Sequence, residues 1–128
     1  MTDTTLDTDG WLTLPFQPAV KPGVKTALTL ACAPSWLAEG KAQILDHHAL
    51  IAINRRIAKL RTSGAMEVVT TLETLYRKHT ALCPYDAKAN RIQLPARVVA
   101  ALGPAPCTLQ VSKEDGHLTL RKPPAPDG

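Results

Sequence analysis

The sequence predicts an α+β fold in which two β-rich segments flank an antiparallel pair of helices. Near both ends of the chain, apolar and polar residues alternate, which is the period-two pattern of a half-buried strand. Between residues 46 and 82, apolar residues recur instead at helical spacing, and Gly64 interrupts them. A chain of 128 residues has room for one compact unit, or for two subdomains that share a core.

In the first segment, residues 1–45, we expect two short strands. Residues 11–14 alternate and are stopped by Pro15, and residues 25–30 alternate again after an irregular loop. Ser35 is a candidate cap for a helical turn that contains Trp36 and is interrupted by Gly40. The segment is therefore expected to be mainly β-structure.

Residues 46–83 are expected to form the helical hairpin. Asp46 is the predicted N-cap of the first helix, and the second is expected to continue to about Leu82 before Pro84 ends it. The apolar stripe of the first helix is Leu50, Ile53, Ile57 and Leu60, and that of the second is Met66, Val69, Leu72, Tyr76 and His79. The hairpin cannot bury both stripes by itself, so we expect it to pack on the β-structure or on a second chain.

Residues 84–122 are expected to form a strand, a short helix and a β-hairpin. The strand spans 91–94 before Pro95, and the helix spans 98–102 before Gly103 and Pro104. The hairpin pairs 108–111 with 117–120 across a polar turn, in which Gly116 can supply a positive φ. The Pro-rich residues 123–128 are expected to be a disordered tail.

Composition narrows the possible functions. Only 4% of residues are aromatic, so we expect small cores of Leu, Ile, Val and Ala, and the net charge of +4 permits a nucleic-acid partner without requiring one. Cys32, Cys83 and Cys107 are far apart, which argues against disulfides and thiol zinc sites and favours a reducing cytoplasm. The acidic start is unlike a signal peptide, and no apolar run is long enough to span a membrane, so we expect a soluble, cytoplasmic protein.

The order of elements from residue 86 to 122 resembles the AbrB/MraZ family of bacterial transcription factors. The family pattern is Gly-Arg, a short β-run, Pro, a short helix ending in Leu-Gly, and a β-hairpin, and here it matches 90–95, 98–103 and the hairpin. Residues 7–15 are similar to the family's Asp-x-x-Gly-Arg signature, which favours a two-unit, MraZ-like organisation with a degenerate first unit. The resemblance implies swapped-hairpin, β-barrel-like units and a DNA-binding, repressor-like regulator that acts as a homo-oligomer.

The resemblance also implies which residues would meet double-stranded DNA. Arg91 keeps the family's Arg position, Asn90 replaces its Gly at a turn that Asn tolerates, and Lys88 and Arg97 lie nearby in sequence. Other positions depart from the family pattern by losing positive charge. Trp11 takes the Arg position of the first unit, Asp9 stands where family members often carry Lys, and Val99 and Ala100 occupy basic positions of the short helix.

These departures leave a second interpretation open. The scaffold could serve as a protein-binding adaptor, an inhibitor or an antitoxin-like subunit, with Trp11 as a partner contact. The basic helical residues Arg55, Arg56, Lys59 and Arg61 are interpreted as an ordinary exposed face rather than as part of a DNA footprint.

The sequence gives little support for catalysis or for a metal site. His47 and His48 follow Asp46, but neighbouring residues at a helix start point about 100° apart, which favours helix capping over a shared metal ion. No pattern around Cys83 or Cys107 indicates a nucleophilic dyad. We therefore expect neither an enzyme nor a bound cofactor.

Overall fold

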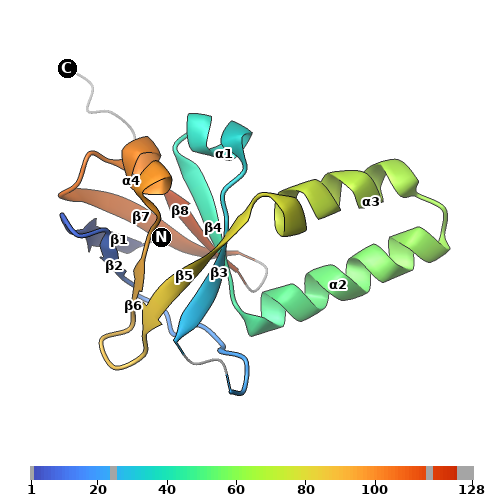
Figure 1. Cartoon of the computed structure of the whole chain (residues 1–128), viewed down its shortest axis with the longest axis horizontal. Coiled ribbons are helices and arrows are strands. Elements are labelled where there is room, and N and C mark those ends of the chain that lie inside the picture. The colour runs from blue at the N-terminus through green and yellow to red at the C-terminus, as the bar shows by residue number, and fades with distance from the viewer. Residues whose placement is uncertain (1, 24–25, 115–116, 124–128) are drawn as a thin grey trace.

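The computed structural model describes residues 2–23, 26–114 and 117–123. In these residues, eight strands close into one antiparallel barrel, in the order β1-β2-β6-β5-β3-β4-β8-β7. A helical arm, α2 (His47–Thr62) and α3 (Met66–Glu73), projects from the barrel, and α1 (Pro34–Ala38) and α4 (Ala96–Leu102) lie next to each other at one end (Figure 1). The predicted α+β class is confirmed. The strands are β1 (Thr2–Leu6), β2 (Trp11–Thr13), β3 (Ala27–Ala31), β4 (Lys41–Leu45), β5 (Thr80–Asp86), β6 (Arg91–Gln93), β7 (Cys107–Glu114) and β8 (His117–Arg121).

The two halves of the chain exchange strands within the barrel. In the hairpin β7–β8, β7 also pairs with β1 of the other half. In the hairpin β3–β4, β3 likewise pairs with β5 of the other half. Two further pairings, β2 with β6 and β4 with β8, join the halves directly. If each of β1–β4 is replaced by the corresponding strand of β5–β8 and the reverse, the same order is obtained when it is read in the opposite direction around the barrel. The barrel therefore has an approximate two-fold arrangement.

The barrel interior is filled by aliphatic side chains from both halves, as the composition predicts. Alternate residues point inward along the strands, which is the period expected of a sheet with one buried face. Tyr85 is the aromatic side chain in this buried cluster, and Cys32 and Cys83 pack in it as small apolar groups. Burial, with the neighbouring Cys32, raises the pKa of Cys83 to about 12, so its thiol stays protonated at neutral pH.

Asp46 fixes the base of the helical arm to the barrel. Its Oδ1 accepts from the Ala49 N–H at 2.8 Å, which confirms the predicted N-cap, and its Oδ2 accepts from the Ala19 N–H at 3.1 Å. Beside the cap, Trp36 and Tyr76 meet edge to face with ring centroids 5.9 Å apart. The parts of the two helix stripes nearest the barrel therefore pack on the β-structure, one of the two possibilities left open by the sequence.

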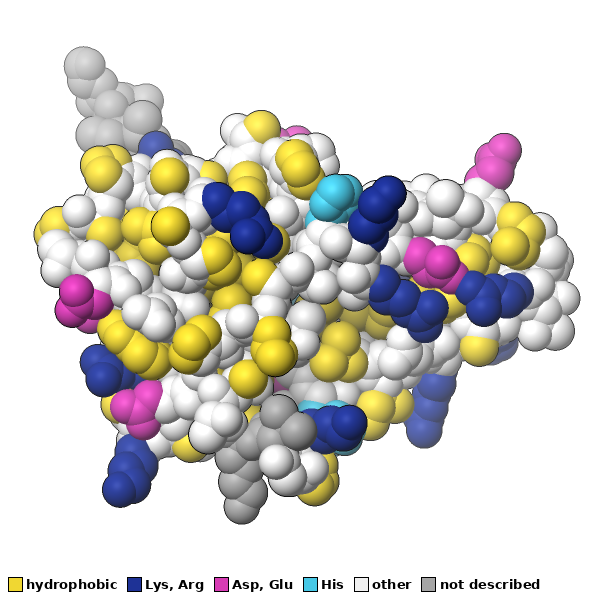
Figure 2. All heavy atoms as spheres, in the orientation of Figure 1, with side chains coloured by type: hydrophobic (Ala, Val, Ile, Leu, Met, Phe, Trp, Pro, Cys, Tyr) yellow, Lys and Arg dark blue, Asp and Glu magenta, His cyan; other side chains and the backbone are white. Residues whose placement is uncertain are grey.

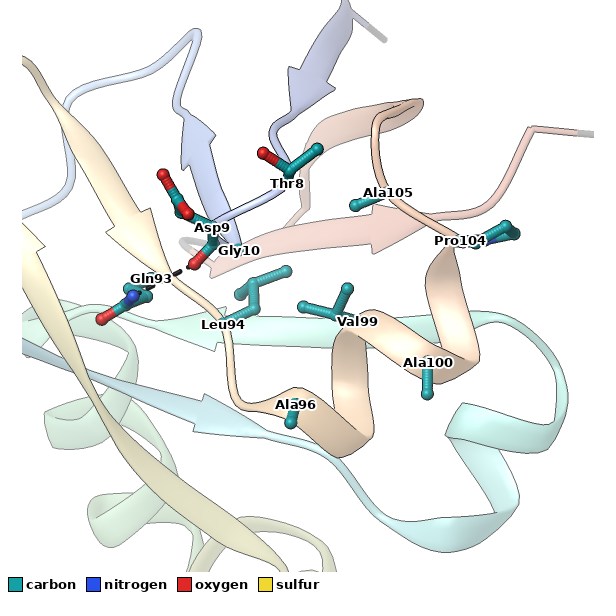
Figure 3. A pocket seen from close by; sticks show the side chains of 10 residues that line it. All are labelled: Thr8, Asp9, Gly10, Gln93, Leu94, Ala96, Val99, Ala100, Pro104 and Ala105. Carbon is teal, nitrogen blue, oxygen red and sulfur yellow. Dashed lines mark hydrogen bonds between the residues drawn. The ribbon is translucent and has the colours of Figure 1, made fainter.

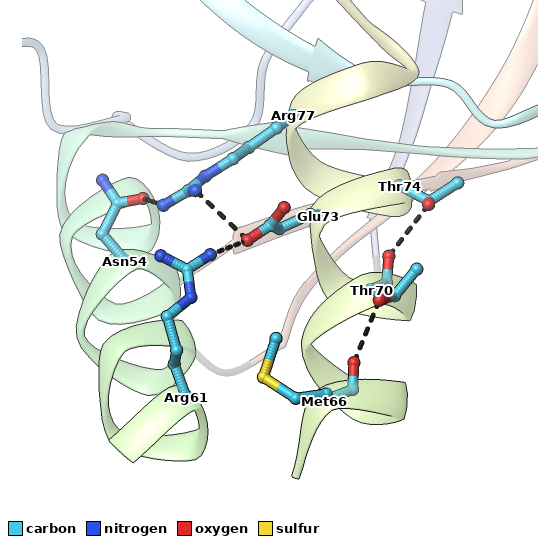
Figure 4. Close-up of polar contacts among 7 residues, drawn as sticks. All are labelled: Asn54, Arg61, Met66, Thr70, Glu73, Thr74 and Arg77. Atoms are coloured by element: carbon cyan, nitrogen blue, oxygen red, sulfur yellow. Dashed lines mark hydrogen bonds and ion pairs between the residues drawn. The ribbon is translucent and has the colours of Figure 1, made fainter. Parts of the chain in front are cut away.

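Away from the barrel, the two helices of the arm are held to each other. Glu73 of α3 pairs with both Arg61 and Arg77, and Arg77 also donates to the Asn54 side chain at 2.8 Å (Figure 4). These pairs are solvent-exposed, so each is worth at most about 1 kcal/mol. At the start of α3, Met66 and Val68 are 52% and 43% exposed.

Several sequence-based boundaries are wrong. Residues 80–82 are not helical, because the π-helical turn η1 (Thr74–Lys78) ends the second helix and β5 begins at Thr80. Pro84 lies inside β5, opposite Ala27, rather than at a helix end. Ser35 caps nothing: α1 begins at Pro34 after Ala33, without a side-chain cap.

Two strands, β1 and β4, were not predicted at all. In β1 only Leu6 is buried, so the strand carries almost no apolar alternation. In β4 four consecutive residues are buried, among them polar Gln43, which hides the period of two. The C-terminal hairpin is confirmed, with Val111 opposite Leu120 and Glu114 opposite His117.

Two predicted segments near the C-terminus fall on residues that the structure does not describe. Turn residues Asp115 and Gly116 and residues 124–128 of the predicted tail lie outside the described residues. Among the described helices, none combines the length and the apolar character needed to cross a membrane.

Candidate functional site

Two turns of the same design lie at equivalent places in the two halves. In the β1–β2 turn, Oδ1 of Asp7 accepts from the N–H groups of Asp9 and Trp11, both at 2.9 Å. In the β5–β6 turn, Oδ1 of Asp86 accepts from the N–H groups of Lys88 and Ala89, at 3.1 and 3.3 Å. A side-chain carboxylate thus organises the backbone of each turn, as in Asx-type turns.

Each turn ends with a residue in the left-handed conformation. Gly10 has φ 86° and Asn90 has φ 52°, and these are the residue types that adopt this region at least cost. The carbonyl of each accepts a hydrogen bond from the other half of the β2–β6 pair. The Leu14 N–H donates to Asn90 and the Leu94 N–H donates to Gly10, both at 2.8 Å. The pairing is centred on Leu12 opposite Ile92, so the two turns flank one shared pair of strands.

The Asn90 side chain is engaged inside the protein. Its Nδ2 donates to the carbonyls of Leu14 and Phe16, both at 3.1 Å, and its Oδ1 accepts from the Tyr85 hydroxyl at 2.6 Å. Both amide N–H donors are therefore used in holding the chain after β2 to the β5–β6 turn. The predicted tolerance of Asn at this turn is confirmed, and the side-chain contacts give Asn90 a structural role in the turn.

Arg91 lies between a carboxylate and an aromatic ring. Its Nε donates to Oδ2 of Asp86 at 3.4 Å, and its guanidinium carbon lies 4.6 Å from the centre of the Trp11 ring. Trp11 and Arg91 are equivalent positions of the two halves, directly after the left-handed turn residue. The Ala89 N–H, helped by Arg91 and Lys88, holds the pKa of Asp86 below its ordinary value.

The structure brings four of the five predicted site residues together and separates the fifth. Lys88 is exposed in the same turn as Asn90 and Arg91, and Trp11 lies against Arg91. Arg97 is on α4, where its Nη2 contacts Cys32 Sγ at 3.4 Å. The Cys32 N–H donates to the carbonyl of His79, the residue just before β5 begins. Lys88, in contrast, follows the end of β5. Arg97 and Lys88 are therefore near opposite ends of β5.

An open groove of about 810 Å³ lies between the β1–β2 turn and α4 (Figure 3). Three of the positions that depart from the family pattern, Asp9, Val99 and Ala100, all line it. The Val99 side chain points toward Leu94 and Gly10, and the Asp9 carbonyl accepts from Gln93 Nε2 at 3.1 Å. The sequence identified the three departures separately, but only the fold brings them into one apolar groove with a single acidic side chain.

Charged side chains are dispersed on the face seen in Figure 2. Lys and Arg are scattered along the barrel rim and the arm, with hydrophobic and acidic groups between them. Both Asp46 oxygens accept backbone N–H groups, in keeping with the capping interpretation of the Asp46-His47-His48 run. Over residues 2–23, 26–114 and 117–123, no group of three or more His, Cys, Asp or Glu side chains could hold a metal ion.

Replacing Asn90 should separate its backbone role from its side-chain role. Asn90→Gly keeps the left-handed backbone but removes the three side-chain hydrogen bonds, so we expect the free energy of unfolding to fall by roughly 1–3 kcal/mol. Asn90→Ala should lose about 1 kcal/mol more, because an L-residue is strained at this φ. Urea unfolding measures both, with Ala89→Gly as a control for added flexibility in the same turn. Equal stabilities of the Gly and Ala variants would contradict this assignment.

The low pKa of Asp86 should depend only partly on Arg91. We expect a carboxyl-detected NMR titration to place it below the ordinary value, and Arg91→Leu to raise it without restoring that value, because the Ala89 N–H remains. A carboxyl with a lowered folded-state pKa stabilises the fold above its unfolded pKa of about 3.9 and loses that contribution as the pH falls through the folded pKa. An Asp86 pKa unchanged by Arg91→Leu would show that the contact is not made in solution.

The site is thus a pair of equivalent turns with different side chains, beside an apolar groove. No protein-family model and no curated protein matches this chain. The geometry of the turns and the groove is therefore the basis for inferring a function.

Proposed function

We propose that the protein is a DNA-binding transcriptional regulator of the swapped-hairpin class, with the β5–β6 turn as its contact element. The observation that carries the proposal is the exchange of β1 and β5 between two hairpins, which sets two Asp-organised turns beside one strand pair. This arrangement supports the swapped-hairpin units that the resemblance to the AbrB/MraZ family implies. The turn with Lys88 and Arg91 supplies the basic groups.

The contacts of Arg91 support a role in recognition. Only its Nε is engaged by Asp86, and no described residue accepts a hydrogen bond from its Nη atoms. Its side chain is 40% exposed, and its guanidinium lies over the Trp11 ring. A guanidinium held in this way keeps its two terminal groups for bidentate binding to phosphate or to a guanine edge. Lys88, exposed in the same turn, would add a phosphate contact.

We further propose that the regulator acts as a homo-oligomer. A single basic turn neutralises few phosphates, so useful affinity requires several copies on repeated DNA sites. The exposed Met66 and Val68 on the arm favour self-association.

Fluorescence anisotropy with a mixed-sequence duplex, at low and moderate salt, tests the DNA proposal. Arg91→Ala should weaken binding about tenfold, as expected for loss of a charged hydrogen-bonding contact. Lys88→Ala should reduce the salt slope by roughly 0.9, the value for one phosphate contact. Arg55→Ala, an exposed arm position, is the matched control and should leave binding unchanged. No binding by the folded wild-type protein at low salt would refute the proposal.

The groove beside α4 favours one other function, that of a protein-binding adaptor. Its apolar lining and the Asp9 carboxylate suit a peptide segment that carries an apolar residue next to a basic one. Ala100→Lys distinguishes the two functions. It should strengthen duplex binding if α4 faces DNA, and leave it unchanged if the groove is a peptide site.

A further inference from the structure

A second cavity, of about 350 Å³, is lined by residues of the helical arm and of β8. One face of α2 forms its first wall, with residues 49, 52, 53 and 56 at the helical spacing i, i+3, i+4 and i+7. Leu72 of α3 and Tyr76 of η1 form the second wall, and His117 at the start of β8 closes it. This volume lies in the range of small-molecule sites.

The lining of this cavity combines an apolar surface with a few polar groups. Ala49, Ala52, Ile53 and Leu72 are apolar, whereas Arg56, Tyr76 and His117 supply hydrogen-bonding groups. Arg56 forms no ion pair with any described carboxylate, unlike Arg61 and Arg77 of the same arm. Its charge lies close enough to Tyr76 to oppose the rise that burial causes in the phenol pKa. A guanidinium beside an apolar wall is suited to a carboxylate that has an apolar body.

Tyr76 is placed at the cavity by an irregular backbone. It lies in the π-helical turn η1, where the His79 N–H donates to the Thr74 carbonyl at 3.1 Å, five residues back. Such turns are rare overall, but those that occur are often found at functional sites. The Tyr76 ring also meets Trp36 edge to face, which anchors the residue to the base of the arm.

We propose that this cavity binds a small monocarboxylate with an apolar body, with its carboxylate on Arg56 and its body against Ala52, Ile53 and Leu72. One cationic residue suits a single negative charge better than a phosphate dianion, and the apolar wall disfavours a bare inorganic anion. The site lies between the arm and the barrel, apart from the two turns. It does not depend on the proposed DNA binding.

Protein-observed NMR with sodium benzoate tests the site. We expect saturable amide shifts confined to the two helix walls and the start of β8, with an affinity in the millimolar to high micromolar range for a ligand of this size. Benzamide lacks the charge and acetate lacks the apolar body, so each should bind at least about tenfold more weakly, as should inorganic phosphate.

Neighbouring arginines provide a matched pair of variants. Arg56→Gln should weaken benzoate binding about tenfold, whereas Arg55→Gln, next in the chain, exposed and outside the cavity lining, should leave it unchanged. Ala52→Phe should fill the cavity and abolish binding without unfolding the protein, because Ala52 is exposed on α2. The proposal would be overturned if benzoate caused no saturable shifts, or if the two arginine variants had equal effects. It would also be overturned if the protein did not bind benzoate and Ala52→Phe instead abolished self-association.

Discussion

The pairing of β2 with β6 is the contact on which the rest of the barrel depends. It joins residues about eighty positions apart in the chain, with Leu12 opposite Ile92, and both side chains are fully buried. Among the described strands, it closes the barrel between the β1–β2 pair and the β5–β6 pair, which otherwise contact the other half only through β1–β7 and β3–β5. The loss of chain entropy on bringing such distant segments together is offset by burial of aliphatic side chains from both halves in one core.

This arrangement gives two equivalent backbone positions at which evolution can place different chemistry. Asp7 and Asp86 organise the turns alike, and Gly10 and Asn90 end them alike, but Trp11 follows one turn and Arg91 the other. The equivalent positions are then close enough for the aromatic ring to support the guanidinium. The proposed contact surface is therefore one-sided, with a basic turn on one half and an acidic turn beside an apolar groove on the other.

Local signals in the sequence were sufficient for some elements and misleading for others. The Asp46 cap, α4 and the C-terminal hairpin follow from short-range patterns, and the structure has all three. His79 and Leu82 continue the apolar helical spacing, so the sequence pattern extends the second helix too far. In the structure a π-helical turn ends this helix before His79. The buried Gln43 concealed β4, and the Thr-rich β1 is recognisable only by its partner β7.

The candidate site shows the same division between local and long-range information. A resemblance to a family predicted Arg91, Lys88 and the left-handed Asn90 from adjacent residues. The stacking of Arg91 on Trp11, the use of the Asn90 amide and the groove shared by Asp9, Val99 and Ala100 all depend on strand exchange. No pattern within either half could have indicated them.

Native-state hydrogen exchange of the Leu14 and Leu94 amides tests the shared barrel most directly. Their N–H groups make equivalent bonds to Asn90 and Gly10, one in each half of the chain. Strand exchange predicts that both amides open only in global unfolding, with the same free energy as that measured by denaturant. A clearly lower opening free energy for one of them would mean that its half unfolds separately, and would contradict the account.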